Sequence, residues 1–523
     1  MSARELNGRG SPLITSGTGL FLGTGGALAN GGPLGLFMGY ALMGSICFAT
    51  MVSLGEMIAY LPIPGGHIAL SARFVDKALS FTMGWNYWYN WTIILPAELS
   101  AAAVLINFWT TKVNNGVWIT ICLLVVVAIN FLGAGAYGEA ECESRAQPFS
   151  GITLTTVWFA SIKVLTIVGL IILGIIISAG GGPEGEVIGF KYWSNPGALN
   201  QYEGIAGTLG RFLGFWAVLT QAAFSYIGTE IVAIAAGEAK NPRRNIPRAI
   251  KKVFIRILVF YLGGTFVIGI ICPSNSPDLK NSGVAKSPFV IAIKQAGIPV
   301  LPSIINACLL TSAWSAASSD LYTSSRALYG LALTRQAPQI FARTTKRGLP
   351  YISLTFCTLF AGLAYMALQS TAYTVFNYLA SLTAAAGLLT WWGINFTYIR
   401  FSKGLKAQGI DRRTLPYWSY ANKGQFAAYY AITLISIVLF FSSYTVFLNT
   451  GGKSHWDAPT FVTNYLPVFL FPVLWIGWKF FKKTHFVRPH EMDFFSGIEQ
   501  IEAEEVEELP PRNMLEKIGQ AIF

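Results

Sequence analysis

Long apolar blocks alternate with short polar stretches along almost the whole chain. The pattern is clearest at residues 117–133, 158–178, 253–272 and 427–448, where each block is almost free of charge. About 20 apolar residues cross the hydrocarbon core of a bilayer as a helix, and a helix satisfies its own backbone hydrogen bonds there. The pattern therefore predicts a series of membrane-spanning helices.

Twelve such segments can be counted. They lie near residues 14–30, 33–60, 80–109, 117–134, 158–179, 211–236, 250–272, 299–332, 351–369, 373–400, 425–448 and 463–481. Composition supports this interpretation, because charged residues make up only 12% of the chain, about half their share in a soluble protein. We expect an all-α polytopic membrane protein with a transporter domain at 14–482, an atypical cytoplasmic N-terminus at 1–13 and an acidic cytoplasmic tail at 483–523.

Basic residues are concentrated in alternate loops. The loops after segments two, six, eight and ten carry most of them, at 73–77, 240–252, 335–347 and 400–413. Because Lys and Arg collect on the cytoplasmic side of a membrane, this alternation places both termini in the cytoplasm. The net charge of +12 then reflects membrane topology, and no nucleic-acid partner is expected.

Glycine is frequent where the first helix should be most regular, although each glycine costs a helix about 1 kcal/mol relative to alanine. SGTG (16–19) lies in segment one, and FSYIGTE (224–230) lies in the middle of segment six. Gly-interrupted helices at corresponding places in two halves of a chain are typical of transporters with inverted repeats. We therefore predict a five-plus-five inverted repeat with helices 1 and 6 broken, plus two extra C-terminal helices.

These two interruptions form a candidate binding site. Broken backbone at membrane depth is tolerated where it lines a cavity or is buried in protein, and the N–H groups that begin a helix bind anions. Gly17, Thr18 and Gly19 are therefore candidates to bind a small carboxylate, and carbonyls of residues 224–228 are candidates to accept bonds from an ammonium group. The alternative is that the glycines only allow close helix packing.

Ionisable residues inside apolar segments need a reason, since a buried acid costs roughly 2.5–3.5 kcal/mol on insertion scales. Glu230 would take up a proton, hold an amine, bond the broken backbone or serve a structural hydrogen bond. Glu98 follows a helix-breaking proline and faces either the substrate path or a polar partner. Lys163 either snorkels to the interface or points inward as a cation that can lose its proton. Asp320 and Arg326 are expected to form a polar pair at the cytoplasmic end of segment eight.

Signatures of enzymes are not found in the sequence. It has no P-loop, which argues against ATP-driven transport, and its four histidines are scattered. We therefore expect no catalytic site, no metal site and no cofactor. The six cysteines lie mostly within or at the ends of apolar segments and are interpreted as packing residues.

Several long motifs occur in an order that resembles the fungal amino-acid permeases, the yeast amino acid transporter branch of the amino acid–polyamine–organocation superfamily. They include GTGLFLGTGGALANGGPLG, SLGEMIAYLPIPGG, LPAELSAAAVLINFW, FSYIGTEIVAIAAGEAKNPRRNIPRAIKK, SAASSDLYTSSRALYGLA and VFNYLASLTAAAGLLTWWGINFTYIRF. The resemblance implies proton-coupled import of amino acids at the plasma membrane by alternating access.

The resemblance also implies roles for single residues. It implies that the first interruption binds the substrate α-carboxylate, that the second binds the α-amine, and that two further residues lie near the substrate side chain. The substrate-binding set is then Gly17, Thr18, Gly19, Glu98, Phe224, Ser225, Tyr226, Ile227, Gly228 and Thr383. Lys163 matches a lysine that stands where sodium-coupled members bind a sodium ion, and Glu230 lies close to the amine, so both are candidates for proton coupling.

Two stretches depart from the family pattern. Residues 1–16 replace the usual half-helix before the first interruption, and a probable insertion at 140–157 precedes the fifth segment. We interpret them as an alternative start and a retained intron. The main hypothesis is an amino-acid importer driven by proton symport, and the alternatives are an amino-acid-sensing receptor without productive flux or an inactive truncated isoform. The preferred amino acid stays open, and the termini are candidate contacts for trafficking or ubiquitination machinery.

Overall fold

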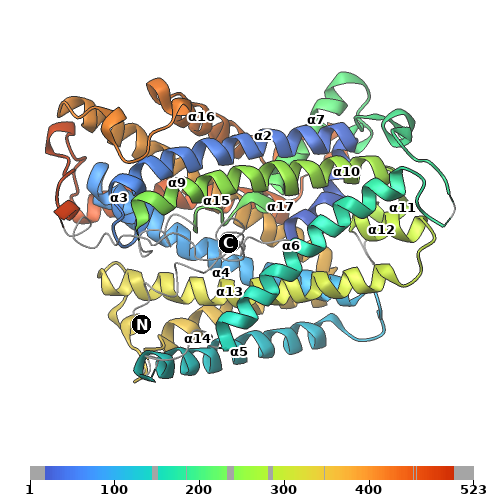
Figure 1. The fold of residues 1–523 in the computed structure, drawn as a ribbon, viewed down its shortest axis with the longest axis horizontal. Helices are drawn as coiled ribbons and strands as arrows, with labels where there is room; N and C mark the ends of the chain where they lie inside the picture. The colour runs from blue at the N-terminus through green and yellow to red at the C-terminus, as the bar shows by residue number, and fades with distance from the viewer. Residues whose placement is uncertain are drawn as a thin grey trace, which may run out of the picture.

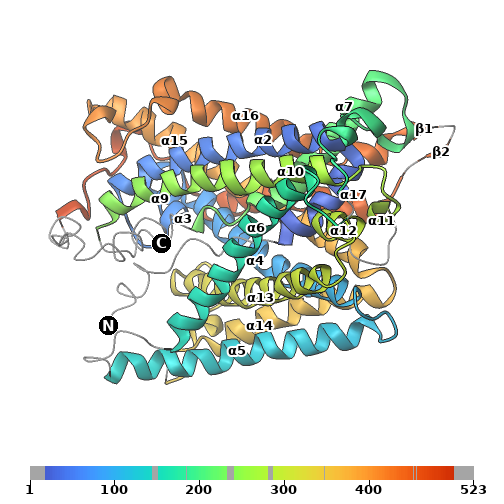
Figure 2. The same ribbon diagram turned by 45° about the vertical axis from the view of Figure 1, so that its right-hand side comes forward.

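A computed structural model describes most of the chain as a bundle of long helices. The described residues are 18–143, 151–183, 185–231, 241–280, 287–346, 348–450, 453–454 and 456–499, with the backbone alone for 132–143, 151–161 and a few shorter stretches. Most of the long helices run roughly parallel to one another, and α6 crosses them obliquely (Figures 1 and 2). This arrangement leaves the loops at the two ends of the bundle.

The helices follow the predicted segments closely. The long ones are α2 (Thr24–Tyr60), α4 (Lys77–Ile106), α5 (Asn115–Glu143), α6 (Gly151–Ser178), α7 (Gly207–Tyr226), α9 (Pro242–Arg256), α10 (Gly263–Ile271), α13 (Leu301–Leu333), α14 (Tyr351–Phe360), α15 (Ala372–Ala407), α16 (Phe426–Phe440) and α17 (Ala458–Lys482). The remaining α-helices, which lie between these segments, are α3 (Gly66–Phe74), α11 (Pro277–Lys280) and α12 (Pro288–Gln295), while α10 continues α9 through a π-helical turn at Ile257–Leu262. Two-residue strands β1 (Asn449–Thr450) and β2 (Lys453–Ser454) pair antiparallel.

Seven helical stretches among the described residues are long and apolar enough to cross a membrane. They are Gly19–Tyr60, Lys77–Ile106, Asn245–Ile271, Tyr351–Leu368, Ala372–Ala407, Tyr420–Phe440 and Ala458–Lys482. The all-helical, polytopic membrane architecture is thereby confirmed. The count of twelve spans and the five-plus-five repeat stay predictions.

The first two predicted segments meet at a sharp corner at Gly32. Its backbone has φ +72°, a region that favours glycine, and a Cβ there would lie 2.8 Å from the Ala198 carbonyl oxygen. Pro33 follows and has no N–H to lose, while the Leu34 N–H donates to the same carbonyl at 2.9 Å. The loop before α7 therefore holds the corner in place.

Burial separates central helices from peripheral ones. Almost every position of α4 is buried, as expected for a helix that is apolar all round, and it packs against α13, α15, α17 and α3. Large exposed side chains instead occur on α5, α14 and α17, for example Leu124, Leu359 and Val473. In a membrane protein these apolar faces meet lipid, so the polar chemistry has to be sought around α4.

The predicted insertion at 140–157 is partly helical. The backbone of α5 continues to Glu143, and that of α6 begins at Gly151. Residues 144–150, between them, lie outside the described residues, as does the side chain of Cys142. The five other cysteines are free, four of them buried.

The first part of the acidic tail predicted at 483–523 packs against the bundle at the α3 end. Phe494 is fully buried and stacks on Phe74 with ring centroids 5.1 Å apart. Arg73 forms an ion pair with Asp493 at 2.9 Å and donates to the Ser496 carbonyl at 2.8 Å. Partial burial raises the pKa of Asp493, but hydrogen bonds from Ser496, Phe495 and Arg73 outweigh it and lower the pKa to about 2. The ion pair therefore stays charged at physiological pH.

Removing the Phe494 ring should destabilise the protein. A fully buried Phe→Ala change in a packed core costs about 3–5 kcal/mol, so Phe494→Ala should lower the melting temperature of the detergent-purified protein. Phe495, the next residue, is 65% exposed, and Phe495→Ala is the matched control with little expected change. Equal melting temperatures for the two variants would contradict the docking of this segment.

Candidate functional site

The helix of the sixth segment stops inside the bundle. α7 ends at Tyr226, Ile227 is extended with φ −61° and ψ 145°, and Gly228 has φ +93°. The Gly228 N–H would bond the Phe224 carbonyl in a continuous helix, but it donates to Glu230 Oε2 at 3.1 Å. The Phe224 carbonyl therefore does not receive the Gly228 N–H that a continuous helix would give it.

The interruption is narrower than the predicted 224–228, because residues 224–226 are helical. Two tyrosines, which the sequence analysis did not identify, surround this helix end. The Tyr261 hydroxyl donates to the Ser225 carbonyl at 2.9 Å, and the Tyr40 hydroxyl lies 2.8 Å from Ser225 Oγ. Aromatic residues in apolar segments are usually packing residues, so the sequence carries no signal that distinguishes these two.

Glu230 joins the interruption to α15. Its Oε2 also accepts a hydrogen bond from Trp391 Nε1 at 3.2 Å. One turn earlier, a Cβ at Gly387 would lie only 2.5 Å from Ile227 Cγ1, so glycine is needed for α15 to approach. Of the alternatives at Glu230, the structure shows the bond to the broken backbone. Its Oε1 is buried without a hydrogen-bond partner among the described residues.

The described helical residues before the corner at Gly32, 18–31, are called the first helix below, and the start of this helix lies against the end of α7. Thr18, the first described residue, is already helical, and Gly19–Gly23 form a π-helical turn. A Cβ at Gly19 would lie 2.7 Å from Ser225 Oγ and 2.9 Å from Ser225 Cα. The missing side chain at Gly19 therefore lets the first helix approach α7 closely, which is the packing role that the sequence left open as an alternative. Gly17 lies outside the described residues.

Open space lies beside this first helix. Gly23, one turn after Gly19, is buried, yet a Cβ there would meet no atom of the described residues within 4 Å. A buried position with no neighbour in the Cβ direction borders a gap in the packing. Such a gap is where a small ligand would be expected if the two helix ends bind one.

Glu98 and Lys163 also reach this region. Thr18 Oγ1 donates to Glu98 Oε2 at 2.6 Å, so the acid has a polar partner on the first helix, and Glu98 Oε1 is buried without one. Lys163, in α6, is only 6% exposed, and Glu98 is one of the two acids whose charge acts on it. Because its side chain is buried, the lysine points inward and does not snorkel to the membrane interface.

The expectation for Asp320 was wrong. Asp320 lies within α13, is 4% exposed and interacts electrostatically with Lys163 and Glu98. Arg326 is not its partner, since its guanidinium lies over the Tyr322 ring at 4.8 Å. The sequence held one usable signal, because an acid inside a membrane segment is itself a sign of a functional site.

Thr383 lies on the face of α15 that meets the interruption. It precedes Gly387 and Trp391 by one and two turns, and residues four apart share a helix face. Its side chain is buried, and its Oγ1 has no hydrogen-bond partner among the described residues. A buried unpaired hydroxyl is costly, so this position suits contact with a ligand.

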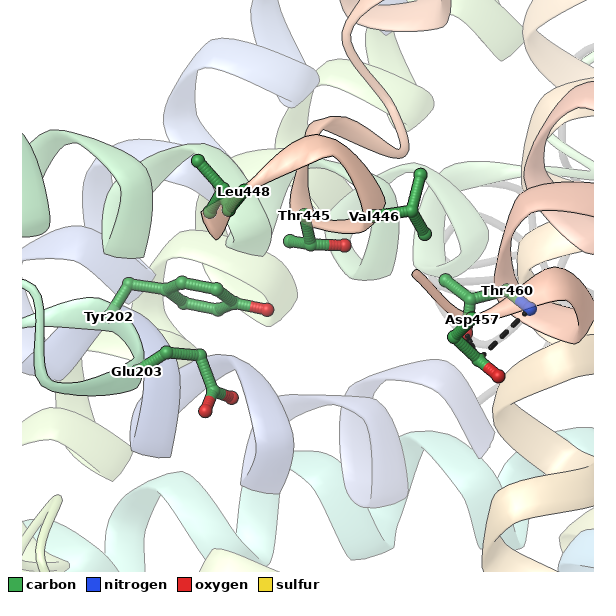
Figure 3. A pocket seen from close by; sticks show the side chains of 7 residues that line it. All are labelled: Tyr202, Glu203, Thr445, Val446, Leu448, Asp457 and Thr460. Atoms are coloured by element: carbon green, nitrogen blue, oxygen red, sulfur yellow. Dashed lines mark hydrogen bonds between the residues drawn. The ribbon is translucent and has the colours of Figure 1, made fainter. Parts of the chain in front are cut away.

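An open pocket lies elsewhere in the molecule. It has a volume of ≈ 170 Å³ and is lined by Tyr202, Glu203, Thr445, Val446, Leu448, Asp457 and Thr460 (Figure 3). Asp457 is engaged as the N-cap of α17, accepting from the Thr460 N–H at 3.1 Å. Glu98, Lys163, Glu230 and Asp320 do not line this pocket. We therefore do not assign the substrate site to it.

Comparison with known proteins identifies the family. Residues 13–491 match the amino acid permease family. The dicarboxylic amino acid permease of Saccharomyces cerevisiae is 41% identical over 500 residues, which cover 94% of this chain and 78% of that protein. The proline-specific permease of Emericella nidulans is 38% identical over 518 residues, covering 97% and 90%. The lysine-specific permease of Saccharomyces cerevisiae is 38% identical over 515 residues, covering 97% and 80%.

The fold is also found in a solved structure. A crystal structure of a mutant manganese transporter from Eremococcus coleocola superimposes with a TM-score of 0.52, covering 92% of this chain and 96% of that one. At 13% sequence identity this likeness concerns the fold alone. The family match and the relatives at 38–41% identity show that the chain belongs to the amino acid permease family, whose members are transporters and not enzymes.

Proposed function

We propose that this protein imports amino acids across the plasma membrane by proton symport and alternating access. The observation that carries the proposal is the close approach of the first helix to the interrupted end of α7 inside the bundle, Gly19 against Ser225. Helix ends at membrane depth expose backbone donors and acceptors, as in transporters with broken helices. An amino acid carries one carboxylate and one ammonium group, which match these two ends.

Each end suits one charge of the substrate. Thr18 and Gly19 lie in the first described helical turn, Gly17 directly precedes them in the sequence, and helix N-termini attract anions. We assign the α-carboxylate to the N–H groups of these three residues. The Phe224 carbonyl, at the end of α7, is assigned the α-ammonium group, together with the rest of the interruption through Gly228. Glu98 and Thr383, both buried with an unpaired oxygen, would then contact the substrate side chain.

Coupling is assigned to Lys163 and Glu230. A buried lysine is easily deprotonated, and Lys163 interacts with the carboxyl of Glu98, which in turn holds Thr18 on the first helix. Protonation of Lys163 would therefore act on the carboxylate end of the site. Glu230 lies at the other end, and a proton on its unpaired Oε1 would remove a buried charge beside the interruption.

The orientation follows from charge. Basic residues lie at the α3 end of the bundle, where Arg73 pairs with Asp493, Arg412 with Glu56 and Lys479 with Asp76. Positive charge collects on the cytoplasmic side, so we place the α3 end and both termini there.

Uptake of labelled amino acids by a transporter-deficient cell tests the function. Because the relatives are named for dicarboxylic amino acids, proline and lysine, acidic, neutral and basic substrates all belong in the panel. Flux of any of them excludes both a receptor and an inactive isoform. Binding without flux would support the receptor.

Gly19→Ala should impair transport without loss of protein from the membrane. The added methyl would meet the Ser225 backbone at 2.9 Å, and overpacking costs about 1–3 kcal/mol, so uptake should fall about tenfold. Gly169 in α6 is exposed, and a Cβ there meets nothing within 4 Å. Gly169→Ala is thus the matched control, and equal uptake by the two variants at equal surface expression would refute the close contact of the two helix ends.

Glu230→Gln should impair gradient-driven accumulation more than folding. The glutamine carbonyl keeps an acceptor for Gly228 and Trp391 but cannot take up a proton. Accumulation is to be measured with and without an imposed pH gradient. If the variant keeps full gradient dependence, Glu230 is only a structural link to α15.

Lys163→Ala should lose accumulation, and Lys163→Arg should not restore it, because a guanidinium hardly deprotonates. Transport by the wild type should depend on external acidity and not on sodium. Normal gradient-driven accumulation by Lys163→Arg, or by Lys163→Ala, would rule out the coupling role.

A further inference from the structure

Three ionisable side chains from three helices form a buried cluster beside the first helix. Glu98 comes from α4, Lys163 from α6 and Asp320 from α13, and each is more than nine-tenths buried. Each interacts electrostatically with the other two. Glu98 Oε1 and Asp320 Oδ2 have no hydrogen-bond partner among the described residues. We call these three residues the α4–α6–α13 cluster.

The cluster has more acid than base. With all three groups ionised it carries two negative charges and one positive charge, which leaves one uncompensated charge at membrane depth. Burying an unpaired charge is costly, and two carboxylates that share a site resist joint ionisation. Binding of one proton makes the cluster neutral, whichever of the two carboxyls receives it.

The surroundings offer no other described charge that would compensate Asp320. On α13 itself, Arg326 lies over Tyr322. On α5, Asn130 donates to the Ser318 carbonyl and hydroxyl at 3.2 Å, but residues 115–131 contain no charge. The stretch 351–368 contains none either, and Lys294 of α12 is exposed. On α4, α6 and the first helix, the groups that reach the cluster are Glu98, Lys163 and the uncharged Thr18.

We propose that Asp320 is a proton-carrying residue, and that the coupling proton is shared between Asp320 and Glu98 on either side of the Lys163 ammonium. This rests on the proposed proton symport and changes its coupling group from a lone lysine to a cluster. An external proton binds one carboxylate oxygen, forming an O–H bond, and the same bond breaks when the proton leaves to the cytoplasm. When Asp320 is protonated, Glu98 is the one carboxylate of the cluster that still attracts Lys163. Glu98 Oε2 accepts the hydrogen bond from Thr18. Protonation at α13 would thus act on the carboxylate end of the substrate site through two contacts.

The variant Asp320→Asn tests the proton-carrying role in proteoliposomes with two assays. Exchange is measured with vesicles loaded with a radiolabelled mixture of the common amino acids. Accumulation is measured with empty vesicles to which the same labelled mixture is added outside. In 1:1 symport, one pH unit supports about tenfold accumulation of a neutral substrate. The wild type should approach tenfold accumulation. Asp320→Asn should show no accumulation, and its transport rate should not depend on pH. It should still exchange external amino acid for the labelled amino acid inside the vesicles. Asp320→Glu should restore accumulation. Ser324→Ala is a buried change on α13 that removes a bond to the Leu321 carbonyl and a side-chain contact with Cys357 but no ionisable group of the cluster, and it should behave as the wild type.

The outcomes separate this inference from the proposed function. Accumulation and a pH profile like the wild type in Asp320→Asn would overturn the role of Asp320 and leave proton symport standing. A wild type that accumulates label without a pH gradient would overturn proton symport itself. If Asp320→Asn does not fold, the test is the pH at which the transport rate of Asp320→Glu is half-maximal. If Asp320 sets this midpoint, a longer acid whose carboxyl lies in a different position must shift it. An unchanged midpoint would overturn the proposal.

Discussion

A helix that stops inside a membrane leaves backbone groups that lipid cannot satisfy, and the centre of this protein is organised around that constraint. The end of α7 meets it with side chains. Glu230 accepts from the freed Gly228 N–H, and the Tyr261 hydroxyl donates to the Ser225 carbonyl. Gly387 lets α15 approach Ile227 closely enough for Trp391 to bond Glu230. The Phe224 carbonyl lacks the Gly228 N–H that a continuous helix would supply, and it is the group to which we assign the substrate ammonium.

The same region links binding to charge. The first helix touches α7 through Gly19 and touches α4 through the Thr18–Glu98 hydrogen bond. Glu98 belongs to the α4–α6–α13 cluster, so a change of protonation there acts on a residue that also holds the start of the first helix. The proposed binding site and the proposed proton site are therefore neighbours on one helix, which would give coupling a simple physical basis.

Much of this arrangement could be predicted from the sequence. The apolar blocks predict the helices, FSYIGTE predicts an interruption that the structure places at Ile227 and Gly228, and isolated acids in apolar segments identify Glu98 and Glu230. The partners of these residues could not be predicted, because Tyr40, Tyr261 and Trp391 have no pattern that sets them apart from packing aromatics. Asp320 was assigned to a helix end because periodicity does not fix how far a helix extends, and the docking of Phe494 depends on contacts with helices far away in the chain.

A cryo-electron microscopy structure with a transported amino acid bound tests the central claim most directly. The account predicts density between the first helix and the end of α7, with the α-carboxylate at the N–H groups of Thr18 and Gly19 and the α-ammonium group at the Phe224 carbonyl. Density in the reverse orientation, or in the pocket between Tyr202 and Asp457, would contradict it.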